Sequence, residues 1–153
     1  MIKIFLLFVL FTSLCSIDEI KYVLNRGFLG RSMDRFLVRF NRHEGIQAEY
    51  EETPIPGRND FEEERKRIGK KLYNLTCEEL GLPSLKELFK LFNKIDFPNE
   101  TDWMDTGLFD VPVWYLYVDD KDYHSNVGTK FLEEFSNIVN LTNIRQYCVS
   151  RYK

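Results

Sequence analysis

The sequence predicts a single α+β domain, or a small α/β domain, behind a short N-terminal leader. Three observations support this fold class. Apolar residues recur at helical spacing in some segments and at every second residue in others. A chain of 153 residues with 13 Phe and 8 Tyr is large enough for one apolar core. Finally, the last third of the chain has the strand, helix and strand spacing of a parallel β-α-β unit.

The first 15 residues have the parts of a secretory signal peptide. A single positive residue, Lys3, precedes an unbroken apolar block from Ile4 to Phe11, and small residues follow. This block is too short for a bilayer span, which needs roughly 20 apolar residues. We therefore expect cleavage after Cys15 or one residue later, no stable membrane span, and one secreted domain over residues 16–153.

The mature chain is expected to begin with a helix and a β-hairpin. Helical spacing of apolar residues predicts a short helix over residues 17–24 that ends near Gly27. Residues 36–40 and 46–50 then alternate apolar and polar side chains on either side of a polar turn. This alternation predicts two hairpin strands with one apolar face. A helix over residues 33–40 is the alternative.

Two central helices are expected next. The first follows a connection rich in proline and glycine, and residues 60–75 begin with the spacing of a capping box. Its apolar stripe consists of Phe61, Ile68, Leu72 and Leu75. The second covers residues 84–92, where Ser84 and Glu87 repeat the capping-box spacing.

The predicted β-α-β unit closes the chain. Residues 111–118 are apolar on both faces, as in a strand of a parallel sheet that is covered on two sides. Residues 128–138 predict a helix, and residues 144–149 predict the returning strand. A crossover of roughly 25 residues suits a parallel connection.

The cysteine count suggests one disulfide. Loss of the leader removes Cys15 and leaves Cys77 and Cys148, an even pair in an oxidising compartment. A bond between them would close a loop of roughly 70 residues and stabilise the fold by on the order of 4 kcal/mol. Two free buried thiols are the alternative.

Three sequons with threonine in the third place support export independently. They begin at Asn74, Asn99 and Asn140, and none contains proline. Each is a competent acceptor for N-glycosylation, which predicts a glycoprotein of the eukaryotic secretory pathway.

The candidate chemistry lies after the strand 113–118, in the acidic loop 119–124. In open α/β sheets, ligands collect beyond the carboxyl ends of parallel strands. This loop offers Asp119, Asp120 and Asp122 as candidate ligands of a hard divalent cation. With Asp120 and Asp122 on a metal, His124 is a candidate acid or base. The Asp-Lys-Asp sequence behind an aromatic strand resembles, over about a dozen residues, the corresponding element of metal-dependent glycosyltransferases, which implies metal-dependent group transfer.

Two functions from different classes follow. The net charge of −3 and the absence of a basic face argue against nucleic-acid binding. No Gly-x-Ser-x-Gly elbow is present to supply a hydrolase nucleophile. We therefore expect a secreted protein that binds an extracellular protein or a small ligand, without catalysis and without a cofactor. The alternative is a small metal-dependent hydrolase or glycosyltransferase-like enzyme that uses the acidic loop.

Overall fold

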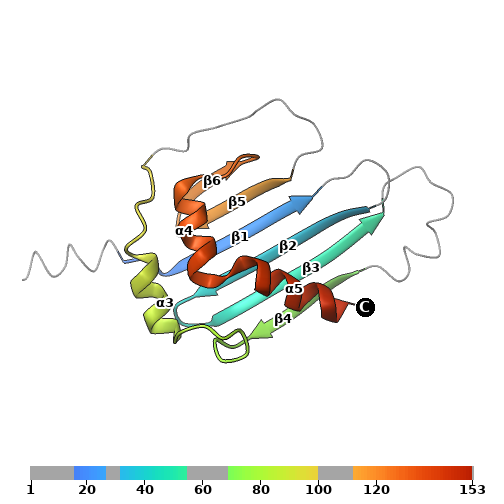
Figure 1. The fold of residues 1–153 in the computed structure, drawn as a ribbon, viewed down its shortest axis with the longest axis horizontal. Coiled ribbons are helices and arrows are strands. Elements are labelled where there is room, and N and C mark those ends of the chain that lie inside the picture. The colour runs from blue at the N-terminus through green and yellow to red at the C-terminus, as the bar shows by residue number, and fades with distance from the viewer. Residues whose placement is uncertain (1–15, 27–31, 55–68, 100–111, 153) are drawn as a thin grey trace, which may run out of the picture.

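A computed structural model describes residues 16–26, 32–54, 69–99 and 112–152. The described strands form one six-stranded sheet in the order β4-β3-β2-β1-β5-β6, and every pairing is antiparallel (Figure 1). The strands are β1 Glu19–Arg26, β2 Ser32–Asn41, β3 Gly45–Pro54, β4 Lys70–Leu75, β5 Val113–Val118 and β6 Lys121–Ser125. The helices are α3 Leu85–Phe92, α4 Lys130–Val139 and α5 Leu141–Tyr152. The predicted leader and the expected start of the first central helix lie outside the described residues.

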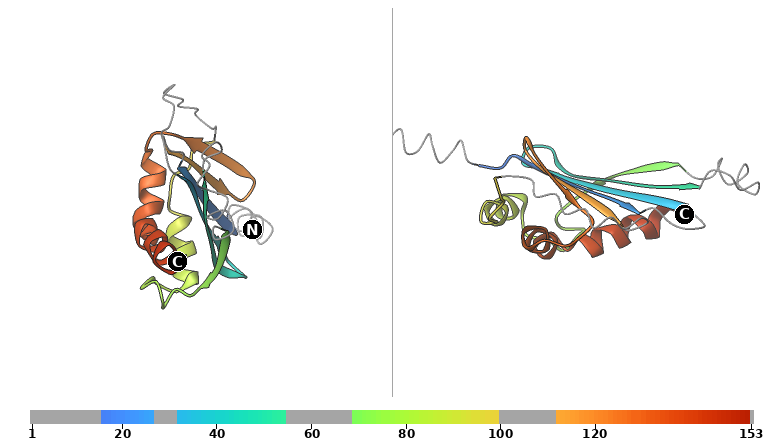
Figure 2. Two further views of the ribbon diagram at one scale, coloured as in Figure 1. Left: turned by 90° about the vertical axis from the view of Figure 1, so that its right-hand side faces the viewer. Right: turned by 90° about the horizontal axis from the view of Figure 1, so that it is seen from above.

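The helices cover one face of the sheet and leave the other face uncovered by any described helix (Figure 2). Helix α5 packs against β3, and α4 contacts both α3 and α5. Alternate residues of each strand therefore point into the core, as period-two side-chain placement requires. The buried apolar strand residues on the helix side are Ile20, Tyr22, Phe36, Val38, Phe40, Ile46, Ala48, Tyr50, Leu75, Trp114, Leu116, Val118 and Tyr123.

Phenylalanines join the helices to the sheet. The ring of Phe92 lies 5.7 Å from Phe40, 5.1 Å from Phe89 and 5.5 Å from Phe135, measured between ring centroids. These four side chains come from β2, α3 and α4, so one aromatic cluster connects both layers of the fold. The pairs of Phe92 with Phe40 and with Phe89 are edge-to-face, a geometry that stabilises beyond the area that the rings bury.

The prediction of an α/β or β-α-β arrangement was wrong. Asp119 and Asp120 form a tight turn, and the chain returns at once as β6, antiparallel to β5. The sequence interpretation did not predict β6, because this strand is short and mostly polar. The expected returning strand, residues 144–149, lies inside α5, where Ile144 and Cys148 are buried four residues apart on one helix face. Together with the buried Leu141, three residues before Ile144, they have the spacing of a helix face, which the period of two of a strand does not give.

Two further elements differ from the prediction. Residues 19–26 form a strand, β1, and not a helix, because β1 is central and pairs with both β2 and β5. Its buried side chains include Tyr22 on the helix side and Val23 on the other, so apolar residues on both faces imitated helical spacing. Residues 70–75, expected at the end of a helix, form the edge strand β4.

The remaining predicted elements are present. The hairpin is formed by β2 and β3, with Phe36 opposite Tyr50 and Phe40 opposite Ile46. Helix α3 begins after Ser84, whose Oγ accepts a hydrogen bond from the Glu87 N–H at 3.3 Å, as a capping residue does. Helix α4 begins after Thr129 in the same way.

The predicted disulfide is also wrong, since Cys77 and Cys148 are both free. The prediction placed Cys148 on a strand, but it lies on the inner face of α5 and is fully buried in the core. Cys77 is half-buried in the turn that follows β4. Burial raises the pKa of the Cys148 thiol to about 11 and also raises the pKa of Cys77.

These thiols predict a labelling result. The thiolate is the reactive form, so at about pH 8 the folded protein should react slowly with iodoacetamide, and Cys148 should be slowest. In denaturant without any reductant, mass spectrometry should find one label on each of the two cysteines. A denatured, unreduced chain that takes up no label would contradict the free thiols. A third label, on Cys15, would show that the leader is retained.

Candidate functional site

A cleft of about 600 Å³ lies between the sheet and helices α4 and α5. Its sheet side is formed by Tyr22, Leu24 and Phe36, from the adjacent strands β1 and β2. Its helix side is formed by Gly128, Thr129, Lys130, Leu132, Glu133, Ser136, Leu141, Thr142 and Arg145. Sites for small ligands have volumes of roughly 300–1,000 Å³ and combine apolar walls with a few polar groups. The cleft therefore has the size and the lining of a ligand site.

The junction between α4 and α5 shapes the cleft. Asn140 lies between the two helices in the left-handed conformation, with φ 52°. Asparagine tolerates this conformation better than most residues. Its backbone N–H closes α4 on the Ser136 carbonyl, while its Oδ1 accepts a hydrogen bond from the Asn143 N–H at 3.4 Å and so begins α5. The chain changes direction there (Figure 1), and both helices supply residues to the lining of the cleft.

An ion pair ties α5 to the sheet beside this cleft. Arg145 Nη2 lies 2.9 Å from Asp34 Oδ2, and the two side chains are only 20% and 19% exposed. Asp34 also lies 3.8 Å from Arg26 Nε and accepts a hydrogen bond of 3.4 Å from the Tyr50 hydroxyl. Arg145 Nε is buried and has no hydrogen-bond partner within the described part of the chain. The guanidinium therefore retains donor capacity beyond its ion pair.

Tyr22 adds a neutral hydroxyl to the lining. Burial raises the pKa of this phenol to about 12, and the nearby Arg145 charge opposes the rise. The hydroxyl thus stays protonated at physiological pH and is able to donate a hydrogen bond. A neutral phenol beside a guanidinium favours an oxygen-bearing group, such as a carboxylate or carbonyl, over a cation.

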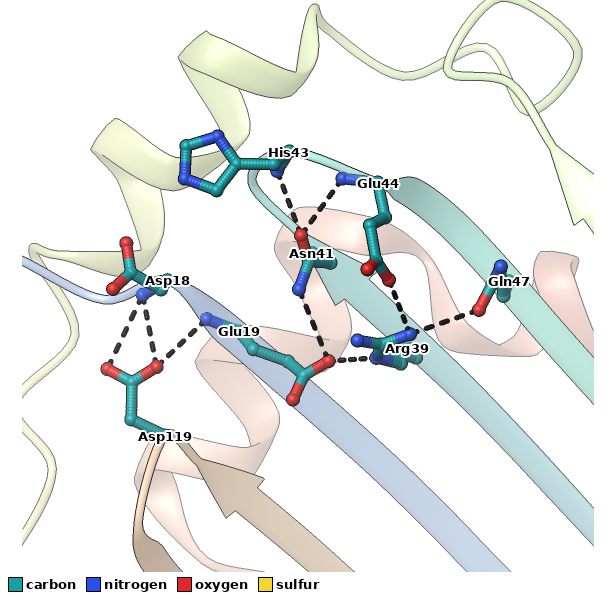
Figure 3. A network of polar contacts seen from close by, with 8 residues as sticks. All are labelled: Asp18, Glu19, Arg39, Asn41, His43, Glu44, Gln47 and Asp119. Atoms are coloured by element: carbon teal, nitrogen blue, oxygen red, sulfur yellow. Dashed lines mark hydrogen bonds and ion pairs between the residues drawn. The ribbon is translucent and has the colours of Figure 1, made fainter.

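Asp119, the first residue of the acidic loop, binds the start of β1. Asp119, in the β5–β6 turn with φ 51°, accepts hydrogen bonds from the Asp18 and Glu19 N–H groups at 3.1 and 3.0 Å (Figure 3). Its own N–H binds the Glu19 carbonyl at 3.0 Å. Burial raises the pKa of this carboxyl, and the backbone hydrogen bonds oppose that rise. Asp119 therefore fastens the beginning of β1 to the β5–β6 turn.

The other candidates in the loop do not converge on a site. Asp120 and Asp122 are exposed, and His124 lies opposite Tyr115 in the β5–β6 pairing, with the two rings stacked at 5.5 Å. Neither these residues nor Asp119 line the cleft. No group of three His, Cys, Asp or Glu side chains that could hold a metal ion exists within the four described ranges. The loop also follows an antiparallel strand, so the ligand rule for parallel sheets does not apply to it.

Polar side chains at the neighbouring ends of β1, β2 and β3 bind one another across the sheet. Arg39 Nε pairs with Glu19, and its Nη1 lies 2.8 Å from Glu44 and 3.2 Å from the Gln47 side-chain oxygen (Figure 3). Asn41 accepts hydrogen bonds from two N–H groups of the β2–β3 turn. These contacts hold the turn and the strand ends in place.

The sequence interpretation missed the residues of the cleft. Arg145 and Asp34 are 111 residues apart in the chain, and neither lies in a motif. They meet only once residues 32–41 form a strand and residues 141–152 form a helix. The spacing of Leu141, Ile144 and Cys148 would have indicated a helix that carries Arg145, but the prediction of a strand over residues 144–149 excluded it.

The predicted glycosylation sites are open to solvent. Asn74 lies on β4, Asn99 lies in the segment after α3, and Asn140 joins α4 to α5; all three are exposed. Their exposure is compatible with glycosylation, which stays a prediction. Among the described residues, no helix is long and apolar enough to cross a membrane.

Comparison of the chain with protein-family models, with curated proteins and with solved structures gave no match.

Proposed function

We propose that the protein is a secreted, N-glycosylated binding protein that holds a small amphipathic ligand in the cleft between the sheet and helices α4 and α5. The observation that carries the proposal is the cleft itself: its volume is that of a ligand site, and its lining combines apolar side chains from the sheet and from both helices with polar side chains such as Ser136 and Arg145. The leader sequence and the three sequons support secretion.

The lining suggests the class of ligand. An apolar body would pack on Tyr22, Leu24 and Phe36, where it would gain roughly 25 cal/mol for each Å² of apolar surface removed from water. An oxygen-bearing head group would find donors at Arg145 and at the Tyr22 hydroxyl. A concave site of this size favours a small molecule over a protein surface as the partner, and no cofactor is needed for binding.

Binding of anilinonaphthalene sulfonate, an apolar fluorescent anion, tests this proposal. We expect saturable fluorescence enhancement with one site per chain. Ser136→Phe places a ring in the cleft and should abolish the enhancement, because Ser136 lines the cleft. Asn137→Phe is the matched control, since Asn137 is the next residue of α4 and is exposed outside the lining.

Both variants must keep the circular dichroism spectrum and the melting temperature of the wild type, because a loosened core also binds this dye. Enhancement that does not saturate, or that Ser136→Phe leaves unchanged in a folded protein, would overturn the proposal.

A further inference from the structure

Strand β4 is an edge of the sheet, and it carries an unusual apolar residue. Leu72, in the middle of this strand, is 69% exposed, and no other large apolar side chain in the described ranges is exposed. Apolar edge strands are sites at which a second chain can add by backbone pairing, and natural proteins protect them with charges or covers.

The two faces of β4 are distinct. On the helix side, Leu75 is buried, and the Tyr73 hydroxyl donates to the Cys148 carbonyl of α5 at 3.1 Å. On the opposite side, Lys70 Nζ lies 3.5 Å from Glu49 of β3. Because side chains alternate along a strand, Leu72 and Asn74 lie on this same open side as Lys70.

Charged side chains, which discourage pairing with a second chain, occupy only the first part of β4. Lys70 and Lys71 open β4, and lysine is the residue most often used to protect an edge. From Leu72 to Leu75 the strand has no charged residue. The exposed Asn74 begins a sequon and stands two residues from Leu72 on the same face, a distance of about 7 Å along a strand.

We propose that Asn74 carries an N-linked glycan that covers Leu72 and the outer edge of β4, and thereby prevents this edge from pairing with a second copy of the chain. The first sugar is attached to the Asn74 side-chain nitrogen, so it is within reach of the Leu72 side chain. This inference rests on the secretion that the proposed function includes. The sequons at Asn99 and Asn140 do not lie on β4, so only a glycan at Asn74 is placed to cover this edge.

The test uses the full chain secreted from eukaryotic cells. Asn74→Gln removes the sequon and leaves Thr76 in place, whose Oγ1 accepts a hydrogen bond from the Glu79 N–H. Intact mass before and after deglycosylation reports which sequons are occupied. Size-exclusion chromatography with light scattering, over a dilution series, reports association. Asn99→Gln, also exposed, is the matched control.

We expect an occupied Asn74 and a monomeric wild type. Asn74→Gln should associate at concentrations at least tenfold lower than the wild type or Asn99→Gln. Adding Leu72→Lys to Asn74→Gln should restore the monomer, which separates edge association from a failure to fold.

Two results would overturn the inference. One is a secreted wild type with Asn74 unoccupied, which leaves the proposed secretion and ligand binding standing; if no sequon carries sugar, the proposed N-glycosylation fails as well. The other is an occupied Asn74 whose removal leaves the protein as monomeric as the wild type, which leaves secretion and ligand binding untouched.

Discussion

Replacing Phe92 by alanine should lower the free energy of unfolding by about 3–5 kcal/mol, as large-to-small changes of buried aromatic residues do. Phe92 is completely buried, and its ring touches three other phenylalanines from β2, α3 and α4. The alanine variant would lose this packing and leave a void that the rigid sheet is unable to close. The loss is a large part of the 5–15 kcal/mol that holds a domain of this size together.

Urea denaturation followed by circular dichroism measures this change. Lys90→Ala is the control, since Lys90 is exposed on the same helix and its contact with Glu87 is a surface ion pair, worth under about 1 kcal/mol. If the Phe92→Ala midpoint stays close to that of Lys90→Ala, then α3 does not pack on the sheet as described.

Replacing Asp34 by alanine should cost about 2–3 kcal/mol of stability, the second largest effect we expect. The change leaves the guanidinium of Arg145 one-fifth exposed and without its carboxylate. It also removes an acceptor from the Tyr50 hydroxyl. The ion pair is partly shielded from water, so added salt should weaken it little.

A double-mutant cycle with Asp34→Ala and Arg145→Ala isolates the pair. We expect a coupling energy of about 1–2 kcal/mol, because contacting charged residues are not additive. The same cycle on Arg35 and Glu49, a more exposed pair at 3.9 Å, is the control and should give under about 1 kcal/mol. Equal couplings for the two pairs would mean that Arg145 is not held in a shielded site.

The parts of the fold that local patterns determine were predictable. The β2–β3 hairpin has strict alternation, and α3 has both a capping serine and an amphipathic face, so each followed from a few neighbouring residues. Strand β1 was not predictable in this way. Val23 lies on the face opposite to the core residues Ile20 and Tyr22, and this extra apolar residue gave Ile17, Ile20, Val23 and Leu24 the spacing of a helix.

The candidate site was less predictable than the fold. The acidic loop stood out because four polar residues follow an apolar strand, yet Asp119 turned out to bind backbone N–H groups at the start of β1. The cleft depends on where α4 and α5 cross the sheet, and that is decided by contacts such as Asp34 with Arg145. No local pattern contains the information that these two residues meet.

The order of strands has a consequence for how the chain reaches its native state. Strand β1 pairs on one side with β2, which follows it directly, and on the other with β5, so that Asp18 meets Asp119 across a separation of 101 residues. During synthesis, β1 to β4 emerge long before β5, and contacts between distant segments form slowly. Until β5 has been synthesised, the backbone N–H and C=O groups of β1 that later pair with β5 have no partner strand. These groups lie beside the apolar side chains of Tyr22 and Val23. The nascent chain therefore exposes an unpaired edge at β1, a strand that is paired on both sides in the folded protein.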